Sequence, residues 1–309
     1  MVYKLYRLSF RTGVHIGKRN LSETETSMCA DTLYSAMCHE FLKMGKEKLE
    51  GFIEKTMNGK ISFSDALPYI RDTYYIPKPI MKIEVETKRG DSTIKKAYKK
   101  LSYIPCDKLE EYMQGKLEIK QEEDKFANNL GELDIRTKVS LSDEEPVPYR
   151  VASYHFKDES GLYVLVAFED EGDINIIDEC FTSLGMVGIG GKRKSGLGRF
   201  TWSEGVIPQE LQKRLLSSGR RYMSLSACLP ADDELESVLS DSNYMLIKRS
   251  GFIASSNYAD ELRRKKDLYV LQAGSCFGQQ FKGSIVDVSE GGSHPVYRYA
   301  RPFLMEVIS

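Results

Sequence analysis

Residues 188–200 combine many glycines with many cations. The segment holds five glycines and no acid, and its four cations are Lys192, Arg193, Lys194 and Arg199. Glycine lets a main chain approach a ligand closely and adopt positive φ, and successive amides in such turns form concavities that bind anions. Lysine and arginine add the charge that phosphate requires. The segment is therefore predicted to contact RNA or another polyanion; the alternative is a solvated basic hairpin turn.

Two familiar nucleotide-binding motifs do not fit this segment. A Walker-type phosphate loop needs a lysine directly after its second glycine, but Leu197 follows Gly196. A dinucleotide fingerprint needs a third glycine where Arg193 stands, and a strand before it where a helix is expected. The pattern favours contact with a phosphodiester backbone over an ATP or NAD site.

A second group of polar residues follows the first expected strand. His15 could act as a general base or stack on a nucleobase, or it could only hydrogen-bond locally. Lys18 and Arg19 add phosphate-compatible charge beside it. Asp31 could assist strand cleavage, but its place in the first turn of an expected helix is explained by helix capping.

A third candidate lies in the second half of the chain. Residues 248–252 read Lys-Arg-Ser-Gly-Phe and join cations, a glycine and an aromatic ring. This combination supports phosphate contact together with base stacking, although the ring of Phe252 could equally belong to the core. No serine stands near a histidine and an acid in a context that predicts a nucleophilic triad.

The overall composition excludes a basic field over the whole molecule. The 309 residues carry 44 Lys and Arg against 45 Asp and Glu, a net charge of −1, so polyanion binding must come from local clusters. Six cysteines without a CxxC pair and four scattered histidines predict buried thiols and no metal site or cofactor. No stretch approaches the roughly 18 apolar residues of a membrane span, and the first residues lack a signal peptide. A cytoplasmic protein without membrane contact is expected.

The apolar pattern predicts an α+β fold with antiparallel sheets and helices on one face. Strands are expected at 2–10, 163–168, 197–202, 222–229, 244–249, 268–273 and 295–306, and helices at 29–44, 61–72 and 176–187. Between them, residues 80–150 are strongly charged and look like an insertion; its segment 88–100 carries a local net charge of +5 and is either a solvated face or a second backbone contact. Two domains, 1–205 and 220–309, are expected on either side of a linker.

Several motifs together resemble a known family, and the resemblance spans nearly the whole chain. They are His15-Ile16-Gly17, Ala30-Asp31-Thr32-Leu33-Tyr34-Ser35-Ala36, Ile76-Pro77-Lys78-Pro79, Lys95-Lys96-Ala97-Tyr98-Lys99-Lys100-Leu101, the Gly188–Gly198 loop, Ala273-Gly274-Ser275 and Val296-Tyr297-Arg298-Tyr299. The chain resembles the RAMP superfamily of CRISPR proteins, and within it the fourth Csm subunit of type III-A interference complexes. The glycine loop alone indicates only the superfamily; the joint set indicates this subunit.

The resemblance implies two ferredoxin-like (RRM-like) units, with the glycine loop between the last helix and last strand of the first. It implies a non-catalytic subunit for antiviral defence that caps the 5′ repeat-derived tag of the guide RNA (crRNA). Such a subunit joins the large polymerase-like Cas subunit to the backbone Csm subunit and meets target RNA only indirectly. A thumb hairpin that bends the guide would come from the 80–150 insertion.

Carried onto this chain, the resemblance assigns RNA contacts to three segments. The residues are Gly190, Gly191, Lys192, Arg193, Lys194, Ser195 and Gly196 in the glycine loop, His15, Lys18 and Arg19 beside it, and Arg249, Ser250, Gly251 and Phe252 in the second unit. The alternative functions are RNA endonucleases of the same superfamily, one metal-independent with His15 as general base, the other metal-dependent with Asp31. Neither residue has an apparent second acid–base partner nearby in the sequence.

Overall fold

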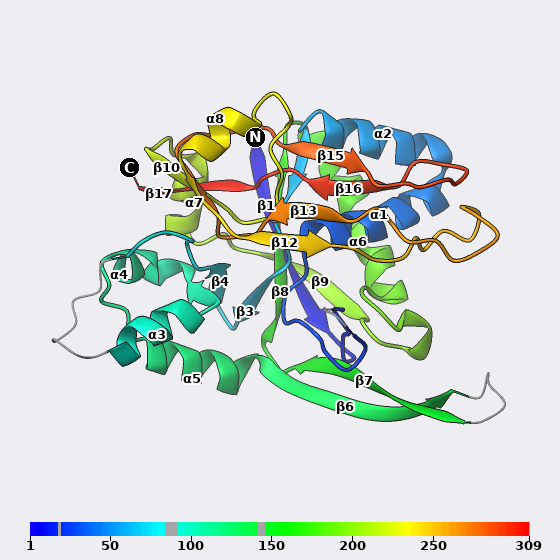
Figure 1. The fold of residues 1–309 in the computed structure, drawn as a ribbon, viewed down its shortest axis with the longest axis horizontal. Helices are drawn as coiled ribbons and strands as arrows, with labels where there is room; N and C mark the ends of the chain where they lie inside the picture. The colour runs from blue at the N-terminus through cyan, green and yellow to red at the C-terminus, as the bar shows by residue number, and fades with distance from the viewer. Residues whose placement is uncertain (18–19, 84–91, 141–145, 309) are drawn as a thin grey trace.

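A seven-stranded antiparallel sheet lies at the centre of the computed structural model, which describes residues 1–17, 20–83, 92–140 and 146–308 (Figure 1). Its strand order is β5-β4-β3-β8-β1-β9, and β2 pairs with β8 along the same edge as β3. The strands are β1 (Val2–Phe10), β2 (Ile61–Phe63), β3 (Leu67–Ile70), β4 (Thr73–Pro77), β5 (Tyr103–Pro105), β8 (Ser160–Phe168) and β9 (Phe200–Gly205). The predicted α+β fold with antiparallel sheets is confirmed.

Strand β8 lies inside the sheet, and every one of its residues is buried. Successive side chains on a strand point to opposite faces, so its apolar run supplies two cores at once. Leu162 and Val164 pack into a first core, whereas Tyr163 and Leu165 pack into a second core on the opposite face. The continuous apolar pattern that predicts a buried strand here is explained by this two-sided burial.

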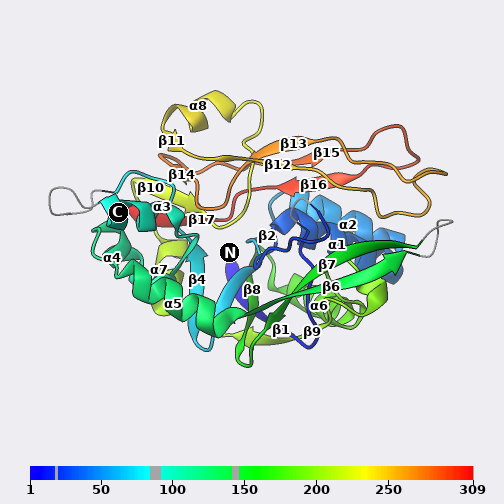
Figure 2. The ribbon, with the colours of Figure 1, turned by 60° about the horizontal axis from the view of Figure 1, so that its bottom comes forward.

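Three helices cover the face of the sheet that holds the first core. They are α1 (Ala30–Met44), α2 (Lys46–Met57) and α6 (Ile174–Val187), and Figure 2 shows α1 and α2 between the sheet and the C-terminal strands. Helices α1 and α2 connect β1 to β2, and α6, preceded by the 3-10 turn Glu171–Asp173, connects β8 to β9. For β1, β3, β8 and β9 the order is thus strand–helix–strand–strand–helix–strand, and the glycine-rich segment lies between α6 and β9.

Some expected elements differ from the structure. The prediction of a helix at 61–72 is wrong, because these residues form β2 and β3; Pro68 has no amide for a helix interior and lies in β3 instead. Helix α2 was not expected, and α7 (Gln209–Leu216) occupies the expected linker. The expected terminal strand is divided into β16 (Tyr297–Ala300) and β17 (Leu304–Ile308). Pro302 lies between the two strands and, without an amide hydrogen, cannot continue the pairing of a strand.

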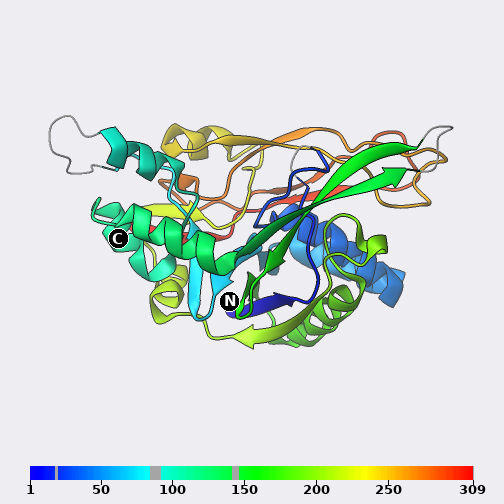
Figure 3. The ribbon, with the colours of Figure 1, turned by 90° about the horizontal axis from the view of Figure 1, so that it is seen from below.

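The charged insertion packs a small helical unit onto the second core and then projects a hairpin. The helical part comprises α3 (Ser92–Lys100), the 3-10 turn Cys106–Lys108, α4 (Leu109–Met113) and α5 (Ile119–Leu130). Tyr98, Tyr112 and Ile119 anchor it in the second core. Strands β6 (Gly131–Ser140) and β7 (Val147–Phe156) then form a long antiparallel hairpin that leaves the body of the molecule (Figure 3). Of the cationic stretch expected at 88–100, residues 88–91 lie outside the described ranges.

The C-terminal residues form a four-stranded sheet and two ribbons. The sheet has the order β11-β14-β10-β17, with β10 (Arg221–Ser224), β11 (Ser242–Asn243) and β14 (Cys276–Phe277), and α8 (Leu235–Ser240) precedes β11. The ribbons pair β12 (Leu246–Arg249) with β13 (Leu268–Leu271), and β15 (Ser284–Asp287) with β16. Tyr299 enters the first core, and Met223 and Met305 enter the second. The segments 1–205 and 220–309 therefore share both main cores, and their division into two domains stays a prediction.

Within the described ranges, no helix has both the length and the apolar character that crossing a membrane requires.

Candidate nucleic-acid interface

The glycine-rich segment forms a tight loop between α6 and β9. Gly190 and Gly198 both have positive φ, and a Cβ on Gly198 would lie 2.0 Å from the carbonyl oxygen of Ile189. A Cβ on Gly190 would lie 2.5 Å from the carbonyl oxygen of His15. No other residue type tolerates both the conformation and the contact, so these glycines are required for the loop to fold back on itself and on its neighbour.

Hydrogen bonds hold the two ends of the loop and close the 3-10 turn, where Ser195 donates to Lys192 O and Gly196 donates to Arg193 O, both at 2.9 Å. Ile189 donates to Gly198 O at 3.0 Å, Gly198 donates to Gly13 O at 2.8 Å, and Gly191 donates to His15 O at 2.8 Å. Among the described residues, the amides at 190 and 192–194 find no acceptor. Unpaired amides in a turn form the kind of concavity that binds anions.

Three cations of the loop have no ionic partner among the residues that the structure describes. Within the described ranges, Lys192, Arg193 and Lys194 form no ion pair. Lys194 and Ser195 are exposed, whereas Lys192 and Arg193 are half-buried around the 3-10 turn Arg193–Ser195. The Lys192 Nζ lies 5.1 Å from the ring centroid of Tyr149 on β7, which joins the loop to the hairpin. A positive surface with free amides is the arrangement that fits a phosphate backbone.

His15 lies beneath the glycine loop instead of on its outer surface. The side chain is 4% exposed, its Nδ1 is 2.8 Å from Ala152 O on β7, and a Cβ on Gly191 would come within 2.6 Å of its Cδ2. The ring is held between β7 and the loop, so general-base chemistry would require it to leave this site. Its direct contact with RNA stays a prediction, and Lys18 and Arg19 lie outside the described residues.

Asp31 is neutralised by two arginines from the C-terminal part. Arg249 donates to both carboxylate oxygens, at 2.7 and 3.0 Å, and Arg298 donates to Oδ2 at 2.5 Å. Burial alone would raise the pKa of Asp31, but the charges of Arg249 and Arg298 outweigh it and lower that pKa. The carboxylate thus lacks the freedom expected of a catalytic base. The guanidinium group of Arg249 is occupied by its two hydrogen bonds to Asp31.

The other residues predicted in the second half are more accessible. Ser250 is exposed, Gly251 has φ 142°, and Phe252 is 57% exposed, so its ring is not in the core. The guanidinium carbon of Arg264 lies 5.7 Å from the centroid of the Phe252 ring. Phe252 and Ser250 are therefore presented to solvent, whereas Arg249 beside them is turned inward.

The structure draws attention to residues 263–266, which our sequence interpretation missed. They read Arg-Arg-Lys-Lys and lie antiparallel to residues 251–253. The four consecutive cations can be read from the sequence, but only the structure shows that they lie beside Phe252.

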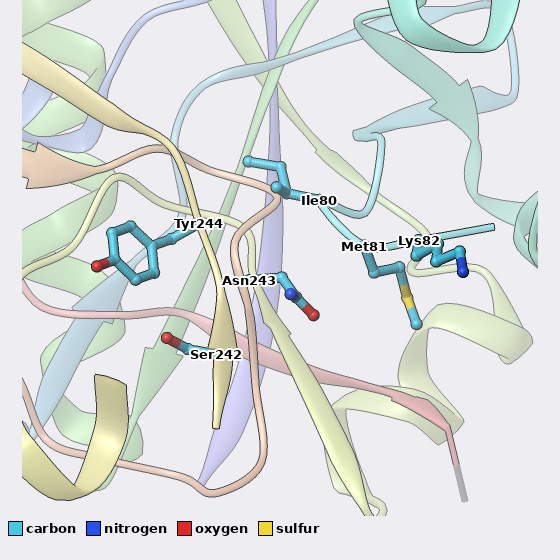
Figure 4. A pocket seen from close by; sticks show the side chains of 6 residues that line it. All are labelled: Ile80, Met81, Lys82, Ser242, Asn243 and Tyr244. Carbon is cyan, nitrogen blue, oxygen red and sulfur yellow. The ribbon is translucent and has the colours of Figure 1, made fainter. Parts of the chain in front are cut away.

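A cavity of about 380 Å³ lies where the segment after β4 meets β11 (Figure 4). Its lining consists of Ile80, Met81, Lys82, Ser242, Asn243 and Tyr244. Its titratable side chains are Lys82 and Tyr244, and its lining contains no carboxylate and no histidine. Elsewhere in the described part of the chain, no cluster of three or more His, Cys, Asp or Glu side chains is arranged to hold a metal.

Known proteins resemble the chain in sequence. A family model described as the CRISPR Csm4 C-terminal domain matches residues 217–307. The CRISPR system Cms protein Csm4 of Mycobacterium tuberculosis (strain ATCC 25618 / H37Rv) is 37% identical over 305 residues, covering 98% of this chain and 97% of that protein. The protein of the same name from Streptococcus thermophilus is 34% identical over 318 residues, covering 99% of both chains.

Solved structures resemble the chain in fold. A chain in a crystal structure of the Csm3–Csm4 subcomplex of the type III-A CRISPR-Cas interference complex matches with a TM-score of 0.68 and 19% identity, covering 98% of each chain. A chain in a Csm1–Csm4 cassette crystallised with pppApA matches with a TM-score of 0.60 and 19% identity, covering 98% of this chain and 96% of that one. The fold is thus shared with these structures, and, given the identity over nearly its full length, the chain belongs to the Csm4 family of CRISPR system proteins.

Proposed function

We propose that this protein is a non-catalytic RNA-binding assembly subunit of a type III-A CRISPR effector complex in the cytoplasm. Family membership supports the assembly, because Csm4 proteins have been crystallised with Csm3 and with Csm1. The observation that carries the RNA-binding part is the glycine loop, whose free amides and unpaired cations match a phosphate backbone. The RNA is the 5′ repeat-derived tag of the guide.

The proposed partners follow from the same assembly. The subunit caps the tag and joins the large polymerase-like subunit, the counterpart of Csm1, to the backbone subunit, the counterpart of Csm3. Target RNA is met only through these neighbours. No cofactor is part of the proposal.

The sheet supports an assignment of the first unit to the ferredoxin-like class. Four adjacent strands at one end of the sheet, in the spatial order β9-β1-β8-β3, are connected by α1 and α6 in the order that this class uses. The glycine loop joins the second of these helices to the last strand. A second ferredoxin-like unit in the C-terminal part belongs to the proposal, and the sheet of β10, β11, β14 and β17 is its candidate.

The β6–β7 hairpin is the candidate thumb that bends the guide at the end of its tag. One side of β6 carries Leu133, Ile135 and Val139, whose exposed fractions are 57%, 48% and 53%. They are two or four residues apart and therefore share one face of the strand. An exposed apolar row on a projecting hairpin fits contact with bases or with a neighbouring subunit.

The endonuclease alternative requires His15 or Asp31 as a catalytic residue, but the structure holds both side chains in other contacts. His15 is enclosed beneath the glycine loop, and Asp31 is bound by two guanidinium groups. We expect purified protein to leave repeat RNA and target RNA intact, with or without magnesium. Cleavage that is lost in a folded His15→Ala variant would establish the metal-independent nuclease, and magnesium-dependent cleavage lost in Asp31→Asn with unchanged stability would establish the other.

The decisive experiment for RNA binding neutralises the loop. We expect Lys192→Ala/Arg193→Ala/Lys194→Ala to weaken guide RNA binding and complex assembly while leaving the fold intact. Each lost single-strand phosphate contact changes the log–log salt slope by about 0.7, so the triple variant should flatten it by about 2.

A matched triple variant of three exposed lysines on and after α2, Lys46→Ala/Lys48→Ala/Lys60→Ala, removes the same charge elsewhere. It controls for the change in net charge. Equal log–log salt slopes for the two triple variants would show that the loop is not part of the RNA-binding site.

A further inference from the structure

Residues 263–266 form an extended edge that the glycine loop does not explain. Ile253 donates to Arg263 O and Lys265 donates to Gly251 O, both at 2.9 Å, and Phe252 pairs with Arg264 in an antiparallel bridge. Side chains alternate along extended backbone, so Arg264 and Lys265 point in opposite directions. The segment consequently has an outward face and an inward face.

The outward face joins unpaired cations to exposed rings. Arg263, Arg264 and Lys266 are exposed, and none forms an ion pair or side-chain hydrogen bond with another described residue. Arg264 lies over the ring of Phe252, which is 57% exposed. Cations beside an open aromatic face are the elements with which proteins bind single-stranded nucleic acid, through phosphates and stacked bases.

A second exposed ring belongs to the same surface. Tyr269 on β13 is 57% exposed and pairs in register with Lys248 on β12. The pKa of Asp267 is lowered first by Lys248, which donates a 2.7 Å hydrogen bond to it, and further by the charge of Arg264. Tyr269 is thus a second exposed ring of the β12–β13 ribbon, next to the ion pair of Lys248 and Asp267.

The inward face carries Lys265. This side chain is half-buried and has no hydrogen-bond or ion-pair partner among the described residues. Burial lowers the pKa of His39, in the middle of α1, and the charges of Arg193 and Lys265 lower it further.

The place of the segment in the molecule agrees with an extended path. In all three ribbon views, the loop between β12 and β13 reaches the same end of the molecule as the outer ends of β6 and β7 (Figures 1–3). The glycine loop contacts this hairpin through Lys192 and Tyr149.

We propose that residues 263–266, with Phe252 and Tyr269, form a second contact for single-stranded RNA in the C-terminal part of the chain. Phosphates lie along Arg263, Arg264 and Lys266, and bases stack on the two rings. The inference rests on the proposed RNA-binding function and extends it to a strand longer than the glycine loop alone can hold.

The test measures binding of labelled single-stranded RNA to the full-length protein in a salt titration. Arg263→Gln/Arg264→Gln/Lys266→Gln should flatten the log–log slope by about 2 with a long oligonucleotide. It should have little effect with an oligonucleotide too short to reach both contacts. The matched control, Lys46→Gln/Lys48→Gln/Lys60→Gln, should leave both slopes unchanged.

Stacking is tested separately from charge. Phe252→Ala should weaken binding of the long oligonucleotide by about tenfold, and Phe252→Trp should preserve it. Circular dichroism and thermal unfolding of each variant establish that the fold persists. Equal losses for Phe252→Ala and Phe252→Trp would contradict a stacking role.

The outcomes separate this inference from the proposed function. If the glycine-loop variant loses affinity while the 263–266 variant behaves like its control, the second contact is refuted and the proposed function stands. If neither variant loses RNA affinity, both the second contact and the proposed RNA-binding function are refuted. If the 263–266 variant impairs complex assembly but leaves the RNA salt slope unchanged, the segment contacts a protein subunit and the inference is again refuted.

Discussion

Replacing Asp31 by asparagine should destabilise the protein strongly, because it leaves two cations facing an uncharged amide. Asparagine keeps the shape of the side chain but removes the charge that holds Arg249 and Arg298. Arg298 is only 4% exposed and cannot turn to water, whereas Arg249 is 24% exposed and can be partly solvated. Removing one partner of a buried ion pair costs about 3–5 kcal/mol, and the partial exposure of Arg249 places our expectation at about 3 kcal/mol.

Urea and thermal unfolding measure this loss directly. We expect the melting temperature of Asp31→Asn to fall by roughly 6–12 °C. The control is Asp72→Asn, because the carboxylate of Asp72 is fully exposed and lies 3.8 Å from Arg7, so its loss should change the free energy of unfolding by less than about 0.5 kcal/mol. Adding Arg298→Met to Asp31→Asn should recover part of the stability, since it removes the unpaired buried cation.

Two results would refute the reasoning. A destabilisation below about 1 kcal/mol would mean that the ion cluster does not hold the C-terminal part to α1. Unchanged stability together with loss of magnesium-dependent RNA cleavage would instead make Asp31 catalytic. The pH dependence adds a check: because the pKa of Asp31 is lowered in the folded state, its contribution should be present above pH 3.8 and disappear as the pH falls below it.

Two further predictions concern the neighbouring carboxyl group and the glycine loop. Burial raises the pKa of Asp65 to about 7 although Ala30 N and Ala227 N donate to it, so this group should make the protein progressively less stable as the pH rises from about 4 to 7. Asp65→Asn should abolish that dependence in urea unfolding at pH 5 and pH 8, and an unchanged dependence would contradict the assignment. Gly198→Ala should distort the loop and lower RNA affinity, because its Cβ would meet a carbonyl oxygen at 2.0 Å. Gly196→Ala, also at positive φ but with no atom within 4 Å, should cost only about 1 kcal/mol, so equal effects on RNA affinity would show that close packing is not what the loop requires.

Local patterns predicted the elements that carry the first core. The alternation in residues 2–10 and the helical spacing after Cys29 and around Phe181 correspond to β1, α1 and α6. The helix predicted at 61–72 is wrong because β2 and β3, with three and four residues, are too short to distinguish a strand period of two residues from a helical period of 3.6. Pro68 argues against a helix. The family resemblance was confirmed by the comparisons with known proteins.

The candidate site was less predictable because its geometry depends on distant segments. Arg249 looked like a phosphate contact, yet its partner Asp31 is 218 positions away in the chain. His15 looked accessible in a loop, yet β7 and the glycine loop enclose it. Sequence proximity describes neither contact, whereas the density of glycine and charge in residues 188–200 is a local property and was visible at once.

The sharing of both hydrophobic cores by the two ends of the chain has a consequence for biosynthesis. Tyr299 packs against Tyr34 in the first core, and Val307 belongs to the second, so the first core is not filled until residue 299 is made and the second not until residue 307. The nascent polypeptide must therefore keep apolar surface uncovered while residues 1–298 are translated. A chain that ends before residue 299 should lack parts of both cores, depend on chaperones and be readily degraded.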